Sequence, residues 1–216
     1  MSIRTFVNMT VQPMLSGHAQ ALEQLQRIVF PTLSAGEQLR AEQYLRHLEL
    51  FPEGQFVLTT SAGQDGTVVG MTSTMRTDFD LADYQHSFSG TSGGGWLTRH
   101  QPEGEWLYGL DMGIHPDWRG RGGARLLYRA RQLLVRRLGL RGQLTVGMMN
   151  GYGALCDRLS GEEYYRQWLN GEREDPTLTR QRNIGFEPLG LIPDYLHDPA
   201  CGNYGVLLRL DAGREV

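Results

Sequence analysis

The chain has 216 residues, a formal net charge of −3 and 40% hydrophobic residues. At this length folding buries roughly 70–75% of the unfolded surface, so we expect a single domain over residues 1–216 with a real core. The weakly acidic charge argues against nucleic-acid binding, and no apolar run reaches the roughly 18 residues of a membrane span. Two cysteines, Cys156 and Cys201, are too few for a disulfide framework or a zinc site, and we expect no metal.

The amino-terminal sequence MSIRTFVNMTVQP lacks the apolar stretch and the cleavage signature of a secretion signal. Two unpaired thiols fit a reducing compartment. These observations predict a cytoplasmic protein.

Hydrophobic periodicity divides the chain into alternating strands and helices. In chain order, the patterns predict a strand at 3–11, helices at 17–30 and 35–50, strands at 56–60, 67–75 and 106–114, a helix at 121–138, and strands at 143–148, 186–192 and 204–210. The pattern Ser34-x-x-Glu37 resembles a capping box before the second helix. Gln64-Asp65-Gly66 is a hairpin turn signal between two of the strands.

Two segments do not fit this regular alternation. Residues 78–104 lack periodicity and contain three consecutive glycines, Gly93 to Gly95. A loop of this length in a compact domain is usually functional, so we expect a lid or substrate loop there. Residues 150–183 are polar and helical in character, and we expect them to form a helical insert.

The most informative stretch is IHPDWRGRGGARLL, residues 114–127, because a glycine-rich turn there separates a predicted strand from a predicted helix. Backbone N–H groups at a helix N-terminus have no partner within the helix, and the helix dipole adds positive charge. Phosphate groups bind at such turns. A Walker A loop would need a lysine after the glycines, and the Rossmann pattern fails because its last position holds Arg125.

The remaining pattern is Arg-x-x-Gly-x-Ala across Arg119, Gly122 and Ala124. It resembles the acetyl-CoA pyrophosphate loop of the GNAT acetyltransferase superfamily, which reads Arg/Gln-x-x-Gly-x-Gly/Ala after a strand. The order of the predicted elements is that of the GNAT fold, and Asn183-Ile184-Gly185-Phe186 resembles the family's late strand entry. The resemblance implies an α+β or α/β fold, with a mixed, mostly antiparallel sheet of about seven strands splayed between the fourth and fifth.

The segment from Asp175 to Phe186 is also similar to GNAT-type domains that are fused to nitrilase-like carbon–nitrogen hydrolases. Because the chain ends at Val216, we expect no attached hydrolase. Gly123 departs from the GNAT pattern, which usually has an apolar residue at this place. We therefore expect a loosened first helical turn.

The resemblance implies that acetyl-CoA is the cofactor and that its binding site lies in and beside this turn. The implied residues are Met112, Gly113, Ile114, Arg119, Gly120, Arg121, Gly122, Gly123, Ala124 and Arg125. Within this set, backbone N–H groups of the strand, at Met112 or Ile114, are implied to bind the oxyanion of the reaction intermediate. Arg119 is implied to contact phosphate, although an arginine that holds the turn is an open alternative.

In the GNAT family, the acetyl group passes by direct attack of a primary amine on the thioester. A lysine-like amine is only about 0.04% neutral at pH 7, so a base or a desolvating pocket is needed. Asp111 is our candidate for base or amine anchor, because a carboxylate in the otherwise apolar strand LYGLDMGI is costly to bury without a role. A structural aspartate paired with an arginine is the alternative. By strand alternation Tyr108 should face the opposite side unless a bulge intervenes.

The family's usual proton donor is a tyrosine four residues before the glycine of Gly-Phe, and this chain has Gln181 there. Tyr152 or Tyr195 could substitute for it, or either could simply pack in the core. In the helix at 121–138, an apolar stripe is expected to face the sheet: Leu126, Leu127, Ala130, Leu133, Leu134 and Leu138. The arginines off this stripe, Arg131 among them, are expected to face solvent, and Arg125 and Arg121 could meet CoA phosphates.

The sequence therefore predicts an acetyl-CoA-dependent N-acetyltransferase acting on a primary amine of a small molecule or a protein. A non-catalytic acyl-CoA-binding or regulatory module and a transferase for longer acyl groups are the alternatives. The sequence does not identify the acceptor, and it leaves open whether the protein forms a homodimer.

Overall fold

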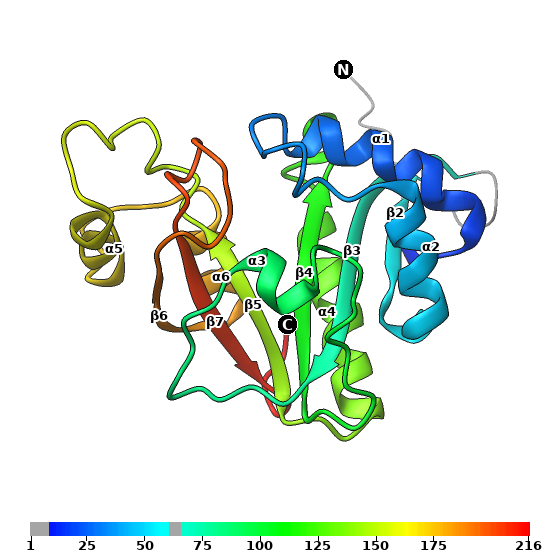
Figure 1. Ribbon diagram of the computed structural model, residues 1–216. Coiled ribbons are helices and arrows are strands. Elements are labelled where there is room, and N and C mark those ends of the chain that lie inside the picture. The colour runs from blue at the N-terminus through cyan, green and yellow to red at the C-terminus, as the bar shows by residue number, and fades with distance from the viewer. Residues whose placement is uncertain (1–8, 61–65) are drawn as a thin grey trace, which may run out of the picture.

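The computed structural model describes residues 9–60 and 66–216. A seven-stranded sheet in the order β1-β2-β3-β4-β5-β7-β6 forms its centre (Figure 1). The strands are β1 (Thr10–Pro13), β2 (Phe56–Thr59), β3 (Val68–Thr77), β4 (Trp106–Ile114), β5 (Gly142–Met148), β6 (Glu187–Ile192) and β7 (Gly205–Asp211). Neighbouring strands are antiparallel except β4 and β5, which are parallel. The predicted mixed, mostly antiparallel sheet is confirmed.

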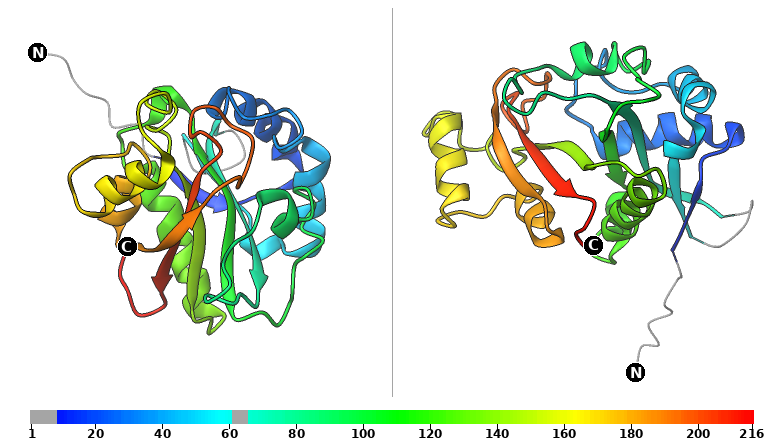
Figure 2. Two further views of the ribbon diagram at one scale, coloured as in Figure 1. Left: turned by 60° about the vertical axis from the view of Figure 1, so that its left-hand side comes forward. Right: turned by 90° about the horizontal axis from the view of Figure 1, so that it is seen from below.

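Helices cover both faces of this sheet. One face carries α1 (Ala19–Val29), α2 (Ala41–Leu50) and the short α3 (Phe88–Ser92), and the other carries α4 (Gly123–Arg137) and α6 (Leu178–Ile184) (Figure 2). Helix α5 (Gly161–Leu169) lies outside the sheet, beyond β6 (Figure 1). Three short 3-10 turns are η1 (Ser16–His18), η2 (Pro52–Gly54) and η3 (Pro116–Trp118). No helix in the described ranges is both long and apolar enough to cross a membrane.

The predicted boundaries hold best in the middle of the chain. The predicted strand at 106–114 coincides with β4, and the helix predicted at 121–138 is α4. The first predicted strand, 3–11, overlaps β1 only at its end, and its residues 3–8 lie outside the described residues. The hairpin signal at Gln64-Asp65-Gly66 also falls largely outside them, although the antiparallel pair it would join, β2 and β3, is present.

The second helix begins later than predicted. Ser34 and Glu37 do bond to each other, with Ser34 Oγ 2.7 Å from Glu37 Oε2, but they lie in a turn rather than at a helix N-terminus. Helix α2 begins at Ala41, where the side chain of Gln43 accepts a hydrogen bond from the Arg40 backbone N–H over 2.8 Å. The N-cap of α2 therefore lies six residues beyond Ser34, and Glu37 instead accepts a hydrogen bond from a distant loop.

Helix α4 is rotated relative to the predicted apolar stripe. Leu127 and Leu134 are buried as expected, but Leu133 is 57% exposed and Arg131 is 0% exposed. The cause is Gly109 on β4, where an added Cβ would lie only 2.2 Å from Arg131 Nη2. The missing side chain leaves a space against the sheet that the guanidinium fills. The expectation that Arg131 faces solvent was therefore wrong.

A bulge in β4 decides which side chains share a face. Ser73 pairs with Asp111 and the next residue, Thr74, pairs with Gly109, so Leu110 is skipped. The extra residue reverses the alternation along the strand. Tyr108 and Asp111 therefore both face α1, α2 and α3, while Gly109 faces α4. The exception that the sequence left open, a bulge between these two residues, is what the structure contains.

Strands β4 and β5 separate after a short stretch of pairing, as the fold predicts. Their ladder runs from Trp106–Gly142 to Gly109–Thr145 and then ends, although both strands continue. The diverging upper ends are visible in Figure 1. This opening between the strands is where the candidate site lies.

Candidate active site

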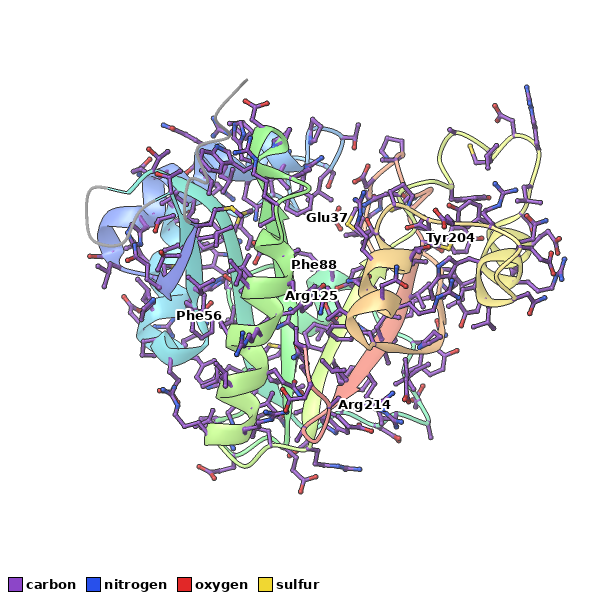
Figure 3. The ribbon with its side chains drawn as sticks, turned by 180° about the vertical axis from the view of Figure 1, so that it is seen from behind. Glu37, Phe56, Phe88, Arg125, Tyr204 and Arg214 are labelled. Atoms are coloured by element: carbon purple, nitrogen blue, oxygen red, sulfur yellow. The ribbon has the colours of Figure 1, made fainter. Side chains whose placement is uncertain are left out.

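One cavity of about 790 Å³ runs from the glycine-rich turn, through the opening between β4 and β5, to the loops on the other face of the sheet. The end beside the turn is called the turn end below, and the end around Asp111 is called the carboxylate end. Figure 3 labels three of its lining residues, which come from different elements: Arg125 of α4, Phe88 of α3 and Glu37 between α1 and α2.

The turn end is made by backbone. Gly120 and Gly122 have φ of +74° and +84°, and an added Cβ at either would meet nothing within 4 Å. These glycines are needed for the left-handed conformation and not for packing. Gly122 is the N-cap of α4 and supplies no side chain to cap it, so the first N–H groups of the helix keep their capacity to bind an anion.

Gly123 has the opposite reason to be glycine. It is buried in the first turn of α4, and a Cβ there would lie 2.7 Å from Leu58 Cδ2 and 3.3 Å from Ile114 Cδ1. The helix therefore approaches the sheet more closely at this point. The expectation of a loosened first turn was wrong, because the missing side chain is replaced by contact with β2 and β4.

The arginines of the turn divide into two groups. Arg119 donates from Nε to the Ile114 carbonyl over 3.0 Å, which is the turn-holding role left open by the sequence, and it also lines the cavity. Arg121 stacks on Trp118, with 4.8 Å between its guanidinium carbon and the ring centroid, and is not part of the cavity lining. Arg125 lines the cavity, as does Arg180 of α6, which no local sequence signal indicated.

The middle of the cavity follows the opening between the strands. Met112, Gly113 and Ile114 line it from β4, and Thr145, Val146 and Met148 line it from β5. Beyond Gly109 and Thr145 these strands do not pair with each other, so one edge of each is open to a ligand. The structure thus brings together nine of the ten residues implied for cofactor binding, with Arg121 as the exception.

The carboxylate end is organised around Asp111. Gln26 Nε2 and the Tyr44 hydroxyl donate to Oδ2 over 2.6 and 3.0 Å, and the Ser73 N–H donates to Oδ1 over 2.7 Å. Burial raises the pKa of Asp111 to about 6, although these hydrogen bonds oppose the shift. The carboxyl group is therefore fixed in place and poised to exchange a proton near neutral pH. Gln26 and Tyr44 were missed by sequence reasoning because they come from separate helices.

Tyr152 lies away from this cavity. Its ring centroid is 5.5 Å from those of Tyr164 and Tyr204, and it packs against Gly202 in the region of the insert. It is not among the residues that line the cavity. We therefore retain the packing interpretation for Tyr152.

Tyr195 lines the cavity, but its hydroxyl proton is directed away from it. His86 Nδ1 lies 2.6 Å from the Tyr84 carbonyl oxygen, which only accepts, so Nδ1 carries the proton. The neutral ring then accepts at Nε2 from the Tyr108 hydroxyl over 2.7 Å, and Tyr108 accepts from Tyr195 over 3.2 Å. Burial lowers the pKa of His86, which favours this neutral form. The hydroxyl proton of Tyr195 is thus used in the hydrogen bond to Tyr108, and Tyr195 does not fit the role of proton donor.

Three loops meet over the carboxylate end. Between α1 and α2, the Ser34 N–H donates to the carbonyl of His197, and the His197 N–H donates to Glu37 Oε2, over 2.9 and 2.7 Å. The Phe88 N–H of α3 donates to the Tyr195 carbonyl over 2.8 Å. The segments 30–40, 86–96 and 193–204 are therefore joined to one another across the opening. We call this arrangement the three-loop roof.

A protein-family comparison matches residues 20–151 to the acetyltransferase (GNAT) family. The chain belongs to this family. The match covers the residues of the turn end from 119 to 124 and also Asp111.

Two relatives from Bacillus subtilis and one solved structure are similar to the chain. The chain is 33% identical over 186 residues to "Probable hydrolase YhcX" of Bacillus subtilis, covering 86% of this chain but only 35% of that protein. It is 26% identical over 207 residues to "Uncharacterized N-acetyltransferase YkwB" of Bacillus subtilis, covering 95% of this chain and 90% of the relative. Among solved structures, "GphF GNAT-like decarboxylase in complex with isobutyryl-CoA" superposes with a TM-score of 0.75 at 22% identity, covering 94% and 99% of the two chains.

Proposed function

We propose that this protein is an acetyl-CoA-dependent N-acetyltransferase that acts on a primary amine of a small molecule. The observation that carries the proposal is the cavity that connects the N-terminus of α4 to Asp111 through the opening between β4 and β5. The anion site at one end suits the phosphates of a long acyl carrier. Asp111 at the other end, with a pKa of about 6, suits a base that takes a proton from an amine. The acyl group and the amine would meet between the two ends.

The residues present fit acetyl-CoA. The uncapped N–H groups after Gly122 would hold the pyrophosphate, and the cationic side chains of Arg125 and Arg180 would face its charges at the rim. The open edges of β4 and β5 would hold the pantetheine arm by backbone hydrogen bonds. When bound, acetyl-CoA supplies a thioester carbonyl for attack, and N–H groups at Met112 or Ile114 would donate to its oxygen.

Asp111 would take the proton that the amine must lose. Its pKa of about 6 lies close enough to neutral pH for it to be ionised at pH 7 and still accept a proton. Its hydrogen bonds to Gln26, Tyr44 and Ser73 hold the carboxylate toward the cavity and leave one oxygen with a single donor. That oxygen is the one we assign to the amine.

The three-loop roof favours a small-molecule acceptor over a peptide or protein acceptor. Its hydrogen bonds join segments that would have to separate before an extended peptide could lie across the site. Beneath the roof, the walls are apolar, with Val29, Phe30, Leu39 and Phe88 among the lining residues. An amine with an apolar body would bury that surface, while its nitrogen would meet Asp111.

The test is release of CoA thiol from acetyl-CoA in the presence of 2-phenylethylamine, spermidine or a short peptide with a free amino terminus. We expect turnover with 2-phenylethylamine and none with the peptide. Binding of acetyl-CoA without thiol release on any of these amines would instead support a non-catalytic binding module. Appearance of acetyl-CoA from malonyl-CoA without an amine would show that decarboxylation, the activity named for the GphF relative, is the reaction.

A further inference from the structure

The place of the family's usual tyrosine is filled by Gln181, and this side chain holds a different tyrosine. Gln181 Nε2 donates to the hydroxyl of Tyr128 on α4 over 2.8 Å. Both residues are buried and both line the cavity. A Cβ on Gly147 of β5 would lie 2.2 Å from Gln181 Oε1, so the glycine in β5 is what allows α6 to bring this amide so close.

The direction of this hydrogen bond leaves the Tyr128 proton unused. An amide nitrogen only donates, so the Tyr128 oxygen is the acceptor. Within residues 9–60 and 66–216, no acceptor for the hydroxyl proton of Tyr128 lies within hydrogen-bond distance. Tyr128 therefore differs from Tyr195, whose proton is committed to Tyr108. Of these two tyrosines in the cavity, only Tyr128 has a proton to give.

A buried arginine lies against the same ring. The guanidinium carbon of Arg131 is 5.2 Å from the ring centroid of Tyr128. Arg131 donates to the Leu144 carbonyl over 3.2 Å, but its Nε and Nη1 have no partner in the described part of the chain. Burying a cation without a full set of hydrogen-bond partners lowers the stability of the fold. We therefore expect Arg131 to have a function that offsets this cost.

The charge of Arg131 and the hydrogen bond from Gln181 act on Tyr128 in the same direction. Burial raises the pKa of the Tyr128 hydroxyl, and both neighbours lower it again. Each of them therefore stabilises the phenolate that remains once the proton has left. A group that must lose a proton inside a buried site needs this kind of support.

We propose that Tyr128 is the proton donor to the departing thiolate, and that Gln181 and Arg131 are positioning residues that act through it. The inference rests on the proposed acetyl transfer. The amine nitrogen forms a bond to the carbonyl carbon, and the carbon–sulfur bond breaks with its electron pair going to sulfur. Asp111 takes one proton from nitrogen and Tyr128 gives one to sulfur. Exchange with water then returns both residues to their starting forms.

The first test needs no acceptor and no turnover. The thiol pKa of bound CoA can be read from the ultraviolet absorbance of its thiolate as pH is raised. A hydrogen bond from Tyr128 stabilises the thiolate, so Tyr128→Phe should raise this thiol pKa by about one unit, the size expected for one hydrogen bond to a charged group. Tyr164→Phe is the matched control, because it removes a buried hydroxyl that bonds to Asp175 outside the cavity. It should leave the thiol pKa unchanged.

The second test measures kinetics with acetyl-CoA and 2-phenylethylamine. Tyr128→Phe should lower kcat about 10- to 100-fold with the KM for acetyl-CoA unchanged. Gln181→Leu should lower kcat about three- to tenfold in the wild-type background and have no effect in the Tyr128→Phe background, because it acts only through the hydroxyl. Thermal unfolding of each variant with CoA confirms that fold and binding persist.

Two results would overturn the inference. One is an unchanged thiol pKa in Tyr128→Phe that still binds CoA, and the other is an additive loss of kcat in the double variant. The pKa measurement uses no acceptor, so its result does not depend on which amine is the substrate. If wild-type protein releases no thiol with any amine yet the Tyr128→Phe shift appears, the proposed acetyl transfer fails while the contact between Tyr128 and sulfur stands.

Discussion

The two ends of the cavity differ in whether backbone or side-chain groups form them. The turn end uses the backbone of one continuous stretch, 119–124, in which glycines supply the conformation. The carboxylate end uses side chains from α1, α2 and β4 together with one backbone N–H of β3, held by hydrogen bonds between residues up to 85 positions apart. A common carrier can be bound by backbone, whereas the acceptor and the proton transfers need particular side chains. The difference predicts that changes at the two ends affect different measured quantities.

The largest effect is expected at the carboxylate end. Asp111→Asn removes the proposed base but keeps the size of the side chain, so kcat should fall about 10²- to 10⁴-fold. The affinity for acetyl-CoA, measured by calorimetry, should change less than about twofold, because the turn end is intact. A large loss of acetyl-CoA affinity in this variant would show that the two ends are not separable.

At the turn end, Gly122→Glu should lower acetyl-CoA affinity about 100-fold. The substitution forces a side chain into a φ of +84° and places a negative charge where the phosphates would bind. Gly139→Glu is the control, because Gly139 also has a positive φ, +66°, and free space around it, but lies at the far end of α4. Equal losses of affinity in both variants would attribute the effect to strain in the helix.

The pH dependence should belong to the carboxylate end alone. Asp111 must be ionised to accept a proton, and its pKa is about 6, so kcat should fall about tenfold between pH 7 and pH 5. Above pH 7 this residue should cause no further increase. Acetyl-CoA affinity should stay level over the same range. If kcat of Asp111→Asn still falls by the same factor between pH 7 and pH 5, the pH dependence comes from another group.

The smallest effect is expected at the rim of the turn end. Arg180→Ala should raise the KM for acetyl-CoA about three- to tenfold, because the arginine is exposed and its charge is screened by solvent. Arg121→Ala should change this KM less than about twofold, because its guanidinium stacks on Trp118 and does not line the cavity. A larger increase in this KM for Arg121→Ala than for Arg180→Ala would instead support the contact between Arg121 and CoA phosphate that the sequence predicted.

The same contrast explains how much could be predicted from the sequence. Gly120, Gly122 and the strand before them form a local pattern, so the turn end and its nature as an anion site were predictable. Asp111 was found because a carboxylate stands out in an apolar strand. Its partners Gln26 and Tyr44 could not be found, because their approach depends on how α1 and α2 pack.

Arg131 and Tyr128 illustrate a second limit. Helical periodicity sorts residues by polarity, so it placed Arg131 toward solvent, and it could not register that Gly109 on another strand leaves room for a guanidinium. Similarly, Gln181 was read as a missing tyrosine, because only the structure shows that its amide reaches the hydroxyl of Tyr128. In both cases the residue type at one position, Gly109 or Gln181, is explained by its contact with a residue on α4, Arg131 or Tyr128.

The short ladder between β4 and β5 has a consequence for how the sheet opens. Four residue pairs, ending at Gly109 and Thr145, join β1–β4 to β5–β7, and the three-loop roof is a second tie on the opposite side of the cavity. The two parts of the sheet each carry long antiparallel ladders of their own. Amide hydrogens on the facing edges of β4 and β5, beyond Gly109 and Thr145, should therefore exchange with solvent before those of either ladder. Bound CoA should slow this exchange.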